Sequence, residues 1–159
     1  MRQLAIEILA GCLAIGLKEC KMAENREEVY RMRGSRFGHE KDDCSVIALA
    51  KLTGMDYAWA HDCLKILGRK DREGSFHTDL LNLIQKTGCY DIIEVKPKPT
   101  SVWTLKCHSY RYPGRYLVRT RISSTMGHVF VMVEGKITDD NQSNTQIIGM
   151  WKVKEKKEE

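Results

Sequence analysis

The sequence predicts an α+β fold, with helices in its first half and an antiparallel sheet in its second. Up to about residue 88, apolar residues recur at helical spacing, and Gly54, Gly68 and Gly88 each follow such a segment. From residue 90 the pattern changes to short β-type runs, with a tight turn at Glu134 and Gly135. Helices first and strands second is the order of α+β domains.

Composition fits one globular domain of ordinary type. The chain has 159 residues, of which 42% are apolar and 30% charged, and its net charge of +5 is too modest to require a nucleic-acid partner. Its six cysteines contain no C-x-x-C pair, which argues against a zinc ribbon and a small disulfide scaffold. Cys107 and His108 lack further ligands at a recognised spacing. We therefore expect a cytoplasmic protein without a metal or cofactor.

Residues 1–22 are expected to form an apolar helix outside the main domain, which spans residues 23–154. Leu4, Ile8, Cys12 and Ile15 recur at helical spacing, with Leu9 and Leu13 beside them, so the helix would pack on the domain or on a second copy of the chain. Residues 9–12 imitate a lipoprotein cleavage box, but Glu7 interrupts the apolar run and only Arg2 precedes it. The run is too short to span a membrane.

Four more helices are expected before the sheet. The charged segment 24–33 is the first, and the apolar segment from Cys44 to Leu52 is a core helix because nearly every side chain in it needs burial. Asp56 is expected to cap a helix over residues 57–67, and Ser75 one over residues 76–87.

Strands then follow, with one short helix among them. Thr100 is the expected cap of that helix, which ends near Leu105. The strands are expected over residues 90–95, 115–122, 127–133, 136–139 and 146–153, and the charged tail, residues 155–159 with Lys154 before it, is expected to fray.

The candidate chemistry centres on Cys44, at the start of the core helix. Asp42 and Asp43 suit the N-cap region, where a carboxylate accepts backbone N–H groups. The helix dipole at this end favours a thiolate over a thiol. A nucleophilic thiolate also needs a base, and His128 opens a buried strand downstream.

The third group depends on the hairpin that follows His128. A two-residue turn at Glu134 and Gly135 sets His128 opposite Asn141 and Phe130 opposite Asp139, so both polar side chains share the face of His128. A three-residue loop would instead bring in Asp140.

These residues resemble the papain-like cysteine peptidase superfamily, in particular its compact phage members and bacteriocin-processing peptidase domains. The resemblance covers about residues 36–154 and rests on Asp43-Cys44, Gly68-Arg69, residues 114–119, Gly127-His128 and the return from Gly135 to Asp139. It implies a cysteine on a helical half, a histidine on a sheet half, and a Cys44, His128 and Asp139 triad with Asn141 as second choice for the orienting group.

The chain departs from the family at the oxyanion hole. A glutamine usually stands six residues before the cysteine, where this sequence has Gly38. The backbone N–H of Cys44 remains, and His39 or the turn at Asp42 and Asp43 could add a donor. The residues around Cys44 also lack the Cys-Gly-Ser-Cys-Trp motif of the larger papain-like enzymes.

The leading hypothesis is therefore a hydrolase of peptide or isopeptide-type amides, directed at a host protein if phage-encoded. The second is an inactive papain-like fold that binds a protein, in which Cys44 is only a small core residue. The third is a nucleic-acid binder that uses Arg115, Arg119 and Arg121 on one strand face.

Overall fold

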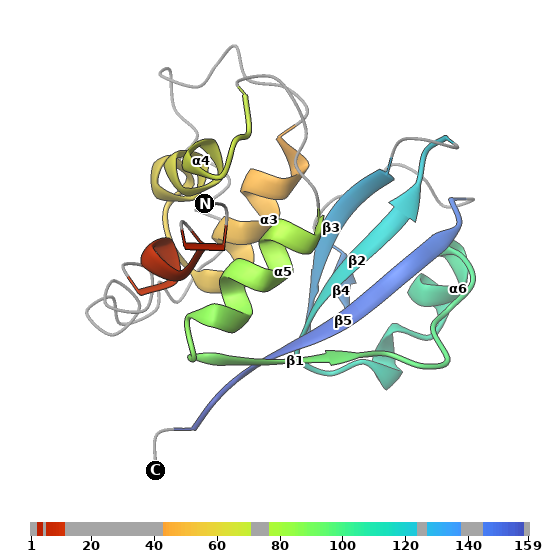
Figure 1. Ribbon diagram of the computed structural model, residues 1–159. Helices are drawn as coiled ribbons and strands as arrows, with labels where there is room; N and C mark the ends of the chain where they lie inside the picture. The colour runs from red at the N-terminus through yellow and green to blue at the C-terminus, as the bar shows by residue number, and fades with distance from the viewer. Residues whose placement is uncertain are drawn as a thin grey trace. The chain divides into compact units, whose positions relative to one another are not determined.

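The computed structural model describes residues 3–4, 6–11, 43–70, 77–123, 127–137 and 145–157 (Figure 1). These residues form helices followed by a five-stranded antiparallel sheet, which confirms the α+β prediction. The chain divides into two compact units, residues 1–90 and 91–159. The boundaries expected after residues 22 and 154 stay predictions.

In the first unit, the core helix is α3, Cys44–Thr53 (Figure 1). Eight of its ten side chains are buried, as its composition requires. Gly54 ends it in the left-handed conformation, with φ of 74°, and its N–H donates to the carbonyl of Ala50 at 2.8 Å. The sequence placed this helix correctly because both end signals are local.

Helix α4, Tyr57–Ile66, begins at the predicted residue and ends one residue before the predicted Leu67, which is its C-cap. The Asp56 carboxylate accepts the N–H of Trp59 at 2.7 Å. After the helix, Gly68 N–H donates to Lys65 and Arg69 N–H donates to Leu64, the pair of bonds that defines a Schellman motif.

Helix α5, His77–Lys86, buries an apolar stripe of Leu80, Leu83 and Ile84. Gly88 follows it with φ of 71°, as predicted. The expected cap Ser75 and the expected helix over residues 24–33 lie outside the described residues.

The N-terminal helix, described at residues 3–4 and 6–11, buries a different side from the one expected. Ile6, Leu9 and Ala10 are buried, whereas Leu4 is 58% and Ile8 60% exposed. Spacings of three and four residues place Ile6, Leu9 and Ala10 on one side of a helix, whereas Leu4 and Ile8 of the predicted stripe are not buried within the chain. Packing of that stripe on a second copy of the chain stays a prediction. Among the described helices, none is long and apolar enough to cross a membrane.

The sheet has the strand order β1-β5-β2-β3-β4 (Figure 1). The strands are β1 Tyr90–Glu94, β2 Arg115–Arg121, β3 Gly127–Val133, β4 Lys136–Ile137 and β5 Ile147–Glu155. β5 continues two residues past its predicted end, so Lys154 and Glu155, which were expected to fray, belong to the strand. The Arg115 guanidinium holds this extension through the Glu155 carboxylate at 2.9 Å.

Helix α6, Val102–Cys107, packs on one face of this sheet. Its cap is Ser101 rather than the predicted Thr100, because the Ser101 hydroxyl accepts the Thr104 N–H at 3.2 Å. A 3-10 turn, η2 Ser109–Arg111, follows it. The core of this face comprises Val102, Leu105, Tyr116, Val118, Phe130, Met132, Ile147 and Met150.

Candidate functional site

Cys44 is the first residue of α3 and is partly buried. Asp43 is the N-cap residue, as predicted, and its backbone carbonyl accepts the Ile47 N–H at 3.0 Å. Its side chain, however, makes no capping hydrogen bond, so the predicted carboxylate cap was wrong. The Asp43 carboxylate instead accepts the Tyr57 hydroxyl at 2.7 Å.

This hydrogen bond joins the beginnings of two helices. Asp43 is 8% exposed and Tyr57 only 1%, so this hydrogen bond is buried and satisfies polar groups that burial would otherwise penalise. The first turn of any helix contains N–H groups without intrahelical acceptors. Because the Asp43 carboxylate is held by Tyr57, it does not occupy those groups in α3.

His61, one turn further along α4, extends this polar cluster. It is buried, its ring stacks on that of Tyr57 with centroids 6.2 Å apart, and its Nδ1 lies 3.5 Å from the Asp62 carboxylate. Sequence reasoning missed His61. The available signal was its spacing of four residues from Tyr57, which places the two rings on one side of a helix.

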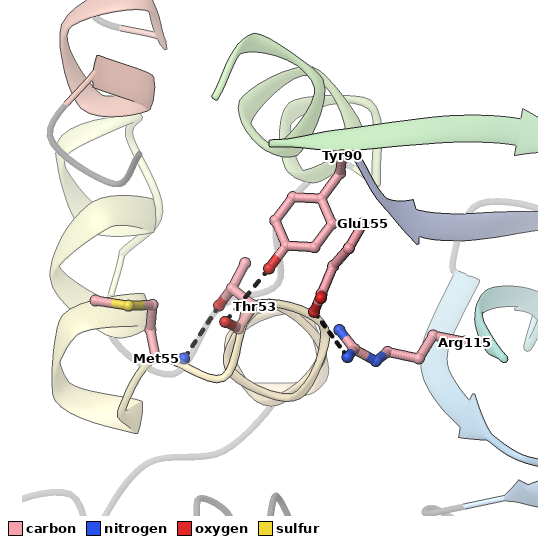
Figure 2. A network of polar contacts seen from close by, with 5 residues as sticks. All are labelled: Thr53, Met55, Tyr90, Arg115 and Glu155. Carbon is pink, nitrogen blue, oxygen red and sulfur yellow. Dashed lines mark hydrogen bonds and ion pairs between the residues drawn. The ribbon is translucent and has the colours of Figure 1, made fainter. Parts of the chain in front are cut away.

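A second tyrosine lies at the opposite end of α3. The Tyr90 hydroxyl donates to the Thr53 carbonyl at 3.5 Å, and the Thr53 hydroxyl accepts the Met55 N–H at 3.3 Å (Figure 2). α3 therefore has a buried tyrosine hydroxyl at each terminus, Tyr57 at the cysteine end and Tyr90 at the other.

His128 belongs to the second unit, as the second residue of β3. It pairs with Thr120 across the antiparallel ladder, and the Thr120 hydroxyl lies 3.4 Å from the His128 carbonyl. Its partly buried ring is 6.3 Å from the ring of Phe130, on the sheet face that α6 covers. The predicted strand position of His128 is thus confirmed.

The hairpin after β3 has the register that the triad prediction assumed. Glu134 and Gly135 form a two-residue turn with positive φ values of 47° and 77°, and Met132 pairs with Ile137. Asp139 and Asn141 themselves lie outside the described residues, as do Gly38 and His39. Because Cys44 and His128 belong to different units, their pairing also stays a prediction.

Other aromatic and thiol side chains differ in exposure. Tyr57 and Cys63 are buried, whereas Trp103 is 60% exposed and Cys107 is exposed. The buried residues of α6 are Val102 and Leu105.

The described parts of the chain bear on the metal-site and arginine-strand alternatives. Within them, no group of three or more His, Cys, Asp or Glu side chains could hold a metal ion. Of the three arginines on β2, Arg115 is engaged by Glu155 (Figure 2).

No protein-family model matches this chain, and the comparisons with curated proteins and with solved structures found no match either. The papain-like resemblance therefore rests on the residues themselves.

Proposed function

We propose that this protein is a papain-like cysteine hydrolase that cleaves a peptide or isopeptide-type amide in the cytoplasm. Cys44 is the nucleophile, His128 is the general base and acid, and Asp139 orients the imidazole, with Asn141 as the alternative orienter. A phage-encoded enzyme of this kind would act on a host protein.

The chemistry follows from these groups. His128 takes the thiol proton, and the Cys44 sulfur attacks the amide carbonyl to form a tetrahedral oxyanion. Collapse breaks the C–N bond, and His128 returns the proton to the departing amine. Water then hydrolyses the thioester, which releases the carboxylic acid and restores the thiol.

The observation that carries the proposal is that the Asp43 side chain does not cap the start of α3. Cys44 stands at the first turn of a buried ten-residue helix whose N-cap carboxylate is bound by Tyr57 instead of by the helix. Backbone N–H groups at this end can therefore stabilise a thiolate or an oxyanion. These donors support the mechanism despite Gly38 at the position of the family's glutamine.

The proposal makes a geometric demand on the sheet. Side chains alternate along β3, so the His128 side chain lies on the same sheet face as Phe130 and on the opposite face from Val129. A working pair requires the Cys44 sulfur to reach the His128 ring from that face, at the Gly127 end of the strand.

Site-resolved alkylation with a haloacetamide across a pH series tests the pair. Cys107, an exposed free thiol, is the internal reference within each sample. We expect Cys44 to react at lower pH than Cys107, and His128→Ala to abolish this difference. His108→Ala, which removes an imidazole from α6, should leave it intact. Equal profiles for Cys44 and Cys107 in the wild type would refute the proposal.

A second candidate function, protein binding without catalysis, is favoured by one surface. Trp103 is 60% and Tyr110 74% exposed, and the Arg111 guanidinium lies 5.6 Å from the Tyr110 ring centre. Exposed Trp, Tyr and Arg side chains dominate the affinity of many protein interfaces. Residues 95–133 also contain seven Lys or Arg and no Asp or Glu, which suits an acidic partner.

This binding function predicts a distinct mutational pattern. A captured partner should be retained by Cys44→Ala and lost by the double variant Trp103→Ala, Tyr110→Ala. Ile93→Ala, which truncates an exposed apolar residue on β1, is the matched control. Equal capture by all variants would exclude this surface.

A further inference from the structure

We infer that Tyr57 is a positioning residue for Cys44, and that its hydroxyl holds the Asp43 carboxylate away from the first turn of α3. The inference rests on the proposed function of Cys44. It assigns this role to a tyrosine on a different helix, thirteen positions after Cys44 in the sequence.

The local preference of Asp43 opposes the arrangement that is observed. Aspartate is among the best N-cap residues, and its carboxylate ordinarily accepts the N–H of the second or third helical residue. Here those residues are Ser45 and Val46, yet the carboxylate bonds to Tyr57 at 2.7 Å. A buried tertiary hydrogen bond has replaced the local one.

That replacement has two consequences for Cys44. A capping carboxylate would occupy first-turn N–H groups that an oxyanion needs. It would also place a negative charge beside the sulfur, and a like charge within about 4–6 Å disfavours a thiolate. Tyr57 prevents both effects while it keeps the buried carboxylate hydrogen-bonded.

Ser45 is a second, independent observation that favours binding of a polar group at this turn. Its side chain is 1% exposed, and its hydroxyl has no hydrogen-bond partner among the described residues. An unsatisfied buried hydroxyl is costly and therefore rare in folded proteins. Ser45 directly follows Cys44, in a turn that the Asp43 carboxylate does not cap.

The titratable groups of this polar cluster come from the start of α3 and from α4. Asp43 precedes α3, and α4 contributes Tyr57, the stacked His61 and the adjacent Asp62. Of these, only Asp43 adjoins Cys44 in the chain.

The test compares Tyr57→Phe with Tyr90→Phe in the full chain. Both variants remove one buried hydroxyl from a tyrosine that bonds an end of α3, so both should lower thermal stability. Only Tyr57→Phe removes a hydrogen bond from the Asp43 carboxylate. We expect it to move the alkylation profile of Cys44 up by about one pH unit, with roughly tenfold slower labelling at neutral pH. Tyr90→Phe should leave the profile at its wild-type position.

Asp43→Asn completes a double-mutant cycle with Tyr57→Phe. In the Tyr57→Phe background it removes the Asp43 charge, so most of the shift should disappear, which no general loss of folding would produce. Equal Cys44 profiles for Tyr57→Phe and Tyr90→Phe would overturn the inference and leave the hydrolase proposal standing. Ordinary thiol reactivity of Cys44 in the wild type would instead reject the hydrolase proposal.

Discussion

At the scale of single residues, the type of a residue predicted its place in a helix or strand better than it predicted its hydrogen-bond partners. Asp43 was correctly placed at the helix start, but its carboxylate bonds Tyr57, fourteen residues away. A local rule cannot anticipate such a contact, because it depends on how two helices pack. His61 was missed although its spacing of four residues from Tyr57 on the same helix was a local signal, whereas the strand position of His128 followed from its neighbours alone.

Tyr116 gives a prediction about alkaline stability. Burial in the sheet core, and then the negative charge of Glu134, raise the pKa of its hydroxyl above the ordinary value of 10.0. The folded protein therefore keeps a proton that the unfolded chain releases, so this group favours unfolding as the pH rises above 10.

We expect the free energy of unfolding to fall less steeply above pH 10 in Tyr116→Phe than in the wild type. Denaturant titrations at several pH values measure this slope. Tyr112→Phe, which alters the neighbouring ring, serves as the control. Parallel slopes for wild type and Tyr116→Phe would contradict the assignment.

At the scale of elements, glycines and caps made the boundaries predictable. Gly54, Gly68 and Gly88 each follow a helix with positive φ, and the turn at Glu134 and Gly135 was located to the residue. The displaced cap of α6 shows the limit of the method. Thr100 and Ser101 are equally good candidates by type, and only the backbone conformation decides between them.

Glu134 offers a prediction at this scale, because it adopts a φ of 47° that side chains other than asparagine, aspartate and glycine tolerate poorly. Glu134→Asn should raise the free energy of unfolding by about 1 kcal/mol. Glu134→Gln keeps the strain and removes the charge, so it should change stability much less. Thermal unfolding of both variants distinguishes conformational strain from charge, and equal effects would exclude strain.

At the scale of the whole molecule, the order of helices and strands was predictable but the pairing of the two units was not. Residues 1–90 and 91–159 each form a compact unit from local sequence signals. The catalytic proposal joins Cys44 from one unit with His128 from the other, so it depends on long-range geometry that periodicity does not encode.

A disulfide measures that geometry directly. In a chain whose other cysteines are replaced by serine, His128→Cys should oxidise with Cys44, since a disulfide needs Cα atoms about 4.4–6.8 Å apart. Val129→Cys points to the opposite face of β3 and should not cross-link. Intact mass under non-reducing conditions reports the bond, and cross-linking through residue 129 in place of residue 128 would rule out the proposed pair.

The strand order has a consequence for synthesis on the ribosome. Among the described strands β5 is made last, yet it lies between β1 and β2 in the finished sheet. Until residues 147–155 emerge, β1 lacks its neighbour and β2 presents an open edge of backbone donors and acceptors. The nascent sheet is therefore vulnerable to aggregation until β5 has been made, and premature termination before β5 would leave that edge exposed permanently.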